Sequence, residues 1–177
     1  MLHRPFLRTA IVATTVSAFL AACGGGNSAG GSAGAAGGTL TIASATPALH
    51  STTLDLSKAA TSGNNTRAAD SFSSTPYCEV FAEGMPGANG QVYAVQVYFR
   101  QSDKAPLHAS VIGGTGASLY AVFDNASGSP ISGLTVDTAA RTVTFNNKVL
   151  SGSAGEKGTV SGTWTFPANS TTAACGN

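Results

Sequence analysis

The chain has 177 residues, and only 10% of them are charged, well below the roughly 25% usual for soluble domains. Lys and Arg number nine against eight Asp and Glu, which gives a formal net charge of +1. With so even a balance and no run of like charges, the sequence argues against nucleic-acid binding and against electrostatic docking on a membrane.

Residues 1–22 have the three parts of an export signal. A short basic head contains Arg4 and Arg8, an apolar stretch follows from about Ala10 to Leu20, and small residues lead to the cleavage point. At roughly a dozen residues the apolar stretch is too short to cross a bilayer, which takes about 20 residues. Its removal leaves seven basic residues against eight acidic ones, so the mature chain has a net charge of −1.

The tetrad Leu20-Ala21-Ala22-Cys23 ends this signal, and it resembles the lipobox of bacterial lipoproteins. The resemblance implies cleavage before Cys23, a diacylglycerol thioether on its thiol and a third, amide-linked acyl chain. Several acyl chains together anchor stably, at about 0.8 kcal/mol for each buried methylene. Because Gly24 and not Asp follows the cysteine, the resemblance also implies the outer membrane. The alternative is an ordinary signal peptide whose cysteine happens to lie at the cut.

Residues 23–38 are almost wholly Gly, Ala, Ser and Asn, a composition that predicts a flexible tether of about 20 Å root-mean-square span. Two Gly-x-Ser-x-Gly matches, at 26–30 and 30–34, resemble the nucleophile elbow of hydrolases. No strand precedes them and no helix follows, so we attribute both to chance. Residues 39–177 are then long enough for one β-domain with a single core.

The β-domain begins with Thr39–Ala45, whose alternating Leu40 and Ile42 predict a first, edge-type strand. The segment 47–76 has the weakest pattern. Leu54 lies in a short strand or at the start of a helix, and residues 62–65 are expected to break any regular element.

From Tyr77 onward short apolar alternations recur between turn signals. The clearest is 91–100, and in the later segment 142–149 we expect Val149 on the apolar face and Lys148 on the opposite one. Strands are expected at 78–82, 91–100, 107–112, 118–123, 134–136, 142–149 and 160–166. The pattern predicts an all-β fold, a small antiparallel β-sandwich or barrel of about seven to eight strands.

Two cysteines remain besides the lipid site. Cys78 and Cys175 are expected to form a disulfide, because an exported protein folds in an oxidising compartment. The rival interpretation, a nucleophilic or metal-binding thiol, lacks a His or a second Cys at ligand spacing.

Some side chains invite a chemical interpretation. Glu79 and Glu83 share one face of a strand and have the residue types of a glycosidase acid–base pair, but a solvated strand face next to a loop is the favoured interpretation. Tyr98 faces away from the expected core and is the best candidate for a surface contact, whereas Trp164 is expected inside the core.

The mature chain has two histidines, His50 near Asp55 and His108 near Asp103. A metal site needs three or four converging ligands, so neither pair predicts one. The run 113–116 (GGTG) lacks the Lys and the helix of a phosphate loop, and we expect a hairpin turn there. We therefore expect no catalytic, cofactor or metal site.

In size, signal, β content and disulfide use, the chain also resembles small outer-membrane lipoproteins that inhibit lysozyme. Their Ser-Gly-Ala-Arg-Tyr loop has a weak counterpart in Thr115–Tyr120, which lacks the arginine and has one residue inserted. The favoured expectation is a non-enzymatic, lipid-anchored envelope protein that supports envelope structure or binds another envelope component. The alternatives are an inhibitor or small-ligand-binding barrel and, as a minor one, a hydrolase.

Overall fold

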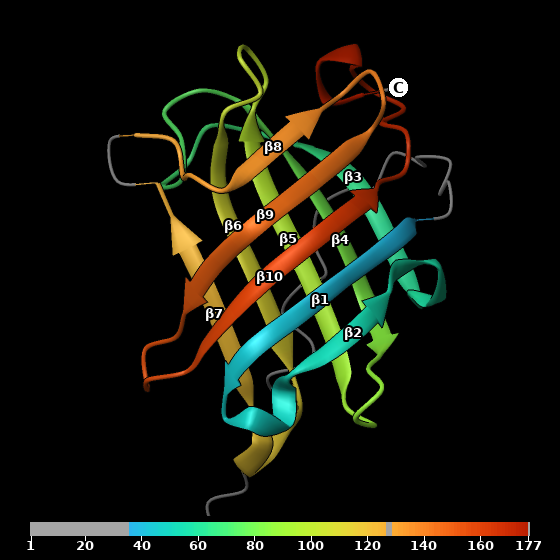
Figure 1. Ribbon diagram of the computed structural model, residues 1–177. Helices are drawn as coiled ribbons and strands as arrows, with labels where there is room; N and C mark the ends of the chain where they lie inside the picture. Colours follow the sequence, from blue (N-terminus) through green and yellow to red (C-terminus); the bar gives the residue numbers. More distant parts are fainter. Residues whose placement is uncertain (1–35, 127–128, 177) are drawn as a thin grey trace, which may run out of the picture.

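The computed structural model describes residues 36–126 and 129–176 (Figure 1). The export signal, Cys23, the tether as far as residue 35 and both Gly-x-Ser-x-Gly matches lie outside the described residues. Within the described part, strands and short 3-10 turns are the regular elements, so the all-β prediction is confirmed. No helix there is long and apolar enough to span a membrane.

Ten antiparallel strands form one continuous sheet in the described chain, in the order β2-β1-β10-β9-β7-β6-β5-β4-β3, with β8 paired to β9. The strands are β1 (Gly37–Thr46), β2 (Thr52–Asp55), β3 (Thr61–Arg67), β4 (Tyr77–Pro86), β5 (Val92–Arg100), β6 (Pro106–Gly113), β7 (Tyr120–Asn125), β8 (Leu134–Asp137), β9 (Thr142–Ser151) and β10 (Lys157–Thr165). The 3-10 helices are η1 (Ala48–His50), η2 (Leu56–Lys58), η3 (Gly116–Ser118) and η4 (Ala173–Cys175).

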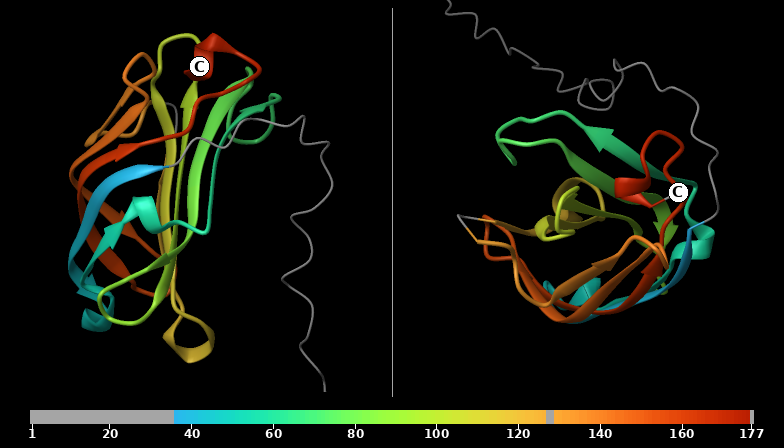
Figure 2. Two further views of the ribbon diagram at one scale, coloured as in Figure 1. Left: turned by 90° about the vertical axis from the view of Figure 1, so that its right-hand side faces the viewer. Right: turned by 90° about the horizontal axis from the view of Figure 1, so that it is seen from above.

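The sheet curls on itself into an incomplete barrel, as the view from above shows (Figure 2). A single bridge between Leu54 and Gly87 brings β2 back to β4. Strands β7 and β9 share one register pair, Phe123 with Ser151, and diverge beyond it. The curled sheet thus has two well-paired halves and is closed only loosely where these halves meet. Its architecture is intermediate between a β-sandwich and a β-barrel, the two alternatives expected from the sequence.

The concave side of the sheet holds the core. Period-two alternation places Val95, Val97 and Phe99 of β5 inside and their neighbours outside, as the sequence predicts. Trp164 is fully buried, as expected for a core residue. The largest fully buried side chains are Trp164, Tyr93, Tyr120, Phe99, Phe145 and Phe166.

Strand β9 differs from the expected alternation because it contains a bulge. Its register with β10 shifts beside Asn147, which has a positive φ of 48°. The shift exchanges the two faces beyond this point: Lys148 is buried and Val149 is 59% exposed. The expected placement of these two side chains is therefore wrong. The Lys148 ammonium forms an ion pair with Asp124 of β7, at the place where the two strands separate.

Two further expectations are corrected in the N-terminal third. Strand β1 lies between β2 and β10 and is not an edge strand. Residues 62–65, which were expected to interrupt regular structure, lie inside the edge strand β3 and pair with Phe81, Ala82 and their neighbours in β4. Strands β2 and β3 account for most of the difference between seven or eight strands and ten.

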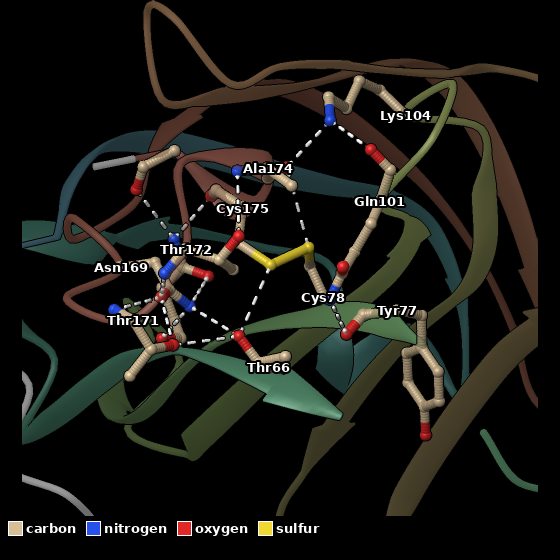
Figure 3. Close-up of a disulfide and its surroundings, with 12 residues drawn as sticks. Thr66, Tyr77, Cys78, Gln101, Lys104, Asn169, Thr171, Thr172, Ala174 and Cys175 are labelled. Atoms are coloured by element: carbon tan, nitrogen blue, oxygen red, sulfur yellow. Dashed lines mark hydrogen bonds between the residues drawn. A yellow bond between two sulfur atoms is a disulfide. The ribbon is translucent and has the colours of Figure 1, made fainter. Parts of the chain in front are cut away.

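The C-terminal segment crosses the end of β3 and β4 and is bound there by a disulfide between Cys78 and Cys175 (Figure 3). Polar side chains add to this attachment. Asn64 Nδ2 donates to the Cys175 carbonyl at 2.8 Å, and Lys104 Nζ donates to the Ala174 carbonyl at 2.9 Å. The end of the chain is therefore fixed by a covalent bond and by side chains that bind its carbonyls.

Candidate functional site

Three residues that the sequence singles out separately lie in one row on the outer face of the sheet. The register pairs Glu79 of β4 with Tyr98 of β5, and Tyr98 with His108 of β6. Since successive strand residues alternate between faces, all three point away from the core formed by Cys78, Phe99 and their neighbours. We call this group, together with the residues that contact it, the outer cluster.

Glu79 is buried, and its carboxylate is surrounded by donors from three residues. Arg67 of β3 donates from Nε at 2.6 Å and forms an ion pair through its second guanidinium nitrogen. Gln96 Nε2 donates to the other carboxylate oxygen, and Asn65 Nδ2 donates at 3.2 Å. Both carboxylate oxygens are thus occupied by hydrogen bonds from neighbouring side chains.

Glu83 lies further along the same face, is exposed, and is separated from Glu79 by Phe81. Four residues along a strand put the two Cα atoms about 13 Å apart. Carboxyl pairs in glycosidases lie about 5–10 Å apart. The two glutamates therefore do not form the acid–base pair considered for them.

Aromatic rings cover the rest of the outer cluster. The Tyr98 ring centroid lies 4.8 Å from that of His108 and 5.2 Å from that of Tyr77. Phe72, from the loop between β3 and β4, stands edge-on to Tyr98 at 4.9 Å and contacts His108 at 5.5 Å. Tyr98 is consequently half-buried, and the ring that faces outward over it is Phe72, which is 42% exposed.

His108 is buried in this cluster, with Nδ1 bonded to the amide oxygen of Asn125. Burial lowers the pKa of His108 below its usual 6.5, although the bond to Asn125 opposes the shift. The ring is therefore neutral at pH 7. Its suggested partner Asp103 lies elsewhere and forms an ion pair with Arg100 at 3.0 Å.

The loop that presents Phe72 is organised around Asp70. The two oxygens of this carboxylate accept from the Phe72 backbone N–H at 2.8 Å and from the Tyr77 hydroxyl at 2.7 Å. The hydrogen bond from Tyr77 is the largest cause of the lowered pKa of Asp70. Sequence reasoning missed Phe72 because a lone aromatic residue among Ser, Asp and Pro gives no periodic signal.

Beside Phe72 the surface is hollowed into a cavity of about 390 Å³. The β3–β4 loop contributes one group of lining residues, the end of β5, the β5–β6 turn and the start of β6 a second, and Ala126, Ser129 and Pro130 a third. Its lining residues are Phe72, Ser73, Ser74, Thr75, Arg100, Ser102, Leu107, Ala126, Ser129 and Pro130.

The remaining histidine, His50, lies at the other end of the domain. It is fully buried, stacks on Tyr120 with a centroid distance of 4.5 Å, and bonds the Tyr93 hydroxyl through Nδ1 at 2.9 Å. Asp55 does not reach it; the Asp55 carboxylate accepts from the Ser57 backbone N–H at 3.0 Å and pairs with Lys58. His50 thus belongs to the core closure at this end.

The glycine-rich run 113–116 connects β6 to the single turn η3 and leads into β7. Gly114 has a φ of 72°, and a Cβ there would meet the Ser118 carbonyl. The glycines therefore serve a tight turn. Across the described residues, no group of three or more His, Cys, Asp or Glu side chains is placed to hold a metal ion. No family model, curated protein or solved structure matches the chain.

Proposed function

We propose that the chain is a lipid-anchored protein of the bacterial cell envelope, in the outer membrane, whose β-domain binds an envelope component and performs no chemistry. The observation that supports it best is the sequence Leu20-Ala21-Ala22-Cys23 at the end of an export signal, followed by a tether of small residues. Disulfides also persist in exported proteins, because these lie in oxidising compartments, and the bond between Cys78 and Cys175 agrees with export.

The arrangement of the domain suits attachment through its N-terminus. Strand β1 begins at Gly37, which pairs with Thr165, the last residue of β10. The tether therefore joins the end of the domain that holds the C-terminal segment. Figures 1 and 2 show β1 starting toward the end where the C-terminus lies, with η1 and η3 at the opposite end. In a domain attached in this way, the end with η1 and η3 is the one remote from the point of attachment.

The state of the polar side chains supports binding over catalysis. Glu79 is occupied by its donors, His108 is buried and bonded to Asn125, and His50 is enclosed by tyrosines. A general acid or base needs access to a substrate proton within hydrogen-bond reach. These three side chains are engaged in contacts that stabilise the fold. Catalysis would require them to be accessible to a substrate.

Replacing Cys23 with Ser tests the anchor. The wild-type protein is expected in the membrane fraction, labelled by a fatty-acid analogue, whereas Cys23→Ser is expected as an unlabelled, uncleaved or mislocalised precursor. The variant Cys175→Ser provides the control, because it should keep the label while losing the disulfide. A soluble wild-type protein, or fatty-acid label retained by Cys23→Ser, would overturn the proposal.

A second candidate function is inhibition of a lysozyme-type enzyme through the end remote from the tether. Here the β4–β5 turn, η1 and the run 113–116 lie together: Asn89 Nδ2 donates to the Leu49 carbonyl, and Gly114 N–H donates to the Val92 carbonyl at 3.2 Å. Leu49, Val92 and Leu119 are each at least half exposed at this end. Such apolar exposure favours a protein-binding surface.

Titration of lysozymes with the mature protein tests this second function. Inhibition that is lost on Val92→Asp but kept on Val149→Asp would support it, since the two valines are similarly exposed and Val149 lies on the outer face of β9, outside the β4–β5 turn, η1 and the run 113–116. Full lysozyme activity at stoichiometric protein, or equal loss of inhibition in both variants, would exclude it.

A further inference from the structure

We infer that the cavity beside Phe72 is a binding site for a neutral saccharide, whose ring lies against the Phe72 side chain and whose hydroxyls bond the serine-rich walls. The inference adds a ligand class to the proposed binding function. It rests on the proposed function only for the cellular role of the ligand. Binding itself does not depend on the lipid anchor, because the cavity belongs to the folded domain.

The size and composition of the cavity point to a small polar ligand. A volume of about 390 Å³ lies in the range of roughly 300–1,000 Å³ typical of small-molecule sites. Five of the ten lining residues are Ser or Thr, and they come from three separate segments. Hydroxyls both donate and accept, as the hydroxyls of a sugar do. Those of Ser74 and Ser102 have no hydrogen-bond partner within the described chain.

The charge of the cavity argues against an anionic ligand. Its one cationic side chain, Arg100, is bound to Asp103 through two contacts, from Nε at 3.1 Å and from the terminal nitrogen at 3.0 Å. Asp103 also accepts from the Ala105 backbone N–H at 3.1 Å, which fixes the carboxylate in place. The charge of Arg100 is thus balanced by the Asp103 carboxylate, and a neutral ligand leaves this ion pair intact.

The exposed ring of Phe72 supplies the apolar surface that a sugar ring needs. A pyranose has a face of C–H groups that packs on an aromatic ring and a rim of hydroxyls that bonds polar neighbours. Phe72 and Phe123 are the large aromatic side chains with substantial exposure among the described residues, and Phe72 lines this cavity.

The walls are held in place before a ligand arrives. Asp70 fixes the Phe72 backbone, and the rings of Tyr98 and His108 support the Phe72 side chain from beneath. On the other wall, the Ala126 N–H donates to the Leu107 carbonyl at 2.7 Å, and the Ile131 N–H donates to the Pro106 carbonyl at 3.1 Å. A preformed site loses less entropy on binding than a mobile one.

Titration of the mature, purified protein with cellobiose, maltose and the N-acetylglucosamine disaccharide tests the site, with chemical shifts or calorimetry as the readout. We expect saturable binding of at least one of these sugars, weakened at least fivefold by Phe72→Ala and retained by Phe72→Trp. The matched control is Phe123→Ala, which removes an equally exposed ring from the outer face of β7 and should leave binding unchanged. Ser102→Phe should abolish binding by filling the cavity from a different segment.

Three results would overturn the inference: no binding of any of the three sugars, equal loss of binding in Phe72→Ala and Phe123→Ala, or preferential binding of inorganic phosphate that falls with salt and with Arg100→Gln. Lipidation at Cys23 is measured separately by fatty-acid labelling. Absence of saccharide binding therefore does not affect the proposed lipid anchor. Absence of lipidation at Cys23 likewise does not affect the saccharide test of the cavity.

Discussion

The two ends of the curled sheet are stabilised in different ways. At the end where the tether joins, the C-terminal segment 166–176 is held by the Cys78–Cys175 disulfide and by side chains that bind backbone groups (Figure 3). At the opposite end, buried rings close the core: His50 stacks on Tyr120 and bonds Tyr93. Burial raises the pKa of Tyr120 to about 12, which keeps its phenol neutral.

The difference follows from the backbone at each end. Segment 166–176 belongs to no strand, so its buried N–H and C=O groups need partners from side chains such as Asn64 and Asn169. Strands β5, β6 and β7 continue their ladders almost to the opposite end, where packing of rings is sufficient. The first end is therefore stabilised by a few polar residues and one covalent bond. The second is stabilised by the packing of buried rings and by a few internal hydrogen bonds.

Removing the disulfide should have the largest effect. Cys78 and Cys175 are separated by 97 residues. The chain-entropy model gives about 4–5 kcal/mol for closing a loop of this length. The double variant Cys78→Ala/Cys175→Ala should lose about that much in the free energy of unfolding, measured with urea. Cys23→Ser, purified alongside, should unfold as the wild type does. A loss below about 1 kcal/mol would show that the disulfide contributes little to the stability of the fold.

Asn169→Ala should have the next largest effect, again at the tethered end. Asn169 is 1% exposed, and its Oδ1 accepts from the backbone N–H groups of Thr171 and Thr172 at 2.8 and 2.9 Å. Leaving these donors unpaired should cost about 2–3 kcal/mol. The comparison variant is Asn146→Ala, whose side chain is exposed and whose effect should stay within about 0.5 kcal/mol. Equal effects would refute the role assigned to Asn169.

Tyr93→Phe probes the opposite end. The Tyr93 hydroxyl accepts from Asn89 Nδ2 at 2.7 Å, which leaves its own proton for His50 Nδ1. Losing it strands two polar groups and should cost about 1–2 kcal/mol. Tyr77→Phe, which removes a bond to the exposed Asp70, should cost below about 1 kcal/mol. A larger effect of Tyr77→Phe would reverse the expected ranking.

The smallest effect concerns pH. Burial lowers the folded-state pKa of His108 below its unfolded value of 6.5, so below pH 6.5 the unfolded state binds more protons. The stabilisation is complete above that pH and is lost as pH falls through the folded-state pKa. The free energy of unfolding should therefore decrease from pH 7.5 to pH 5, with a shallower slope in His108→Gln. Carboxylates such as Asp70 act in the more acidic range, near pH 4 and below. Identical slopes in the two proteins would contradict the assignment.

Much of the fold was accessible from the sequence where one face of a strand is buried. Strand β5 alternates strictly between core and surface, and its limits differ from the expected ones by a single residue. Strand β3 has no such pattern, because its residues are polar, it lies at an edge, and its pairing with β4 and the contacts of Asn64 hold it in place. The bulge at Asn147 was equally unpredictable, since two adjacent asparagines give no sequence signal that the strand exchanges its faces.

The outer cluster was predictable only in parts. Alternation places Glu79 and Tyr98 on the outer face, but the register that sets Tyr98 between Glu79 and His108 depends on pairing that a sequence does not state. Phe72 and the cavity beside it depend on a loop fixed by Asp70, and on the connection after β7. These are contacts between segments far apart in the chain.

Mass spectrometry of the N-terminal peptide of the mature protein, taken from membranes, decides whether the protein is anchored in the envelope through Cys23. We expect a peptide that begins at Cys23 and has the added mass of a diacylglyceryl group and an amide-linked acyl chain. A mature chain that begins at any other residue, or one that begins with unmodified Cys23, would contradict it.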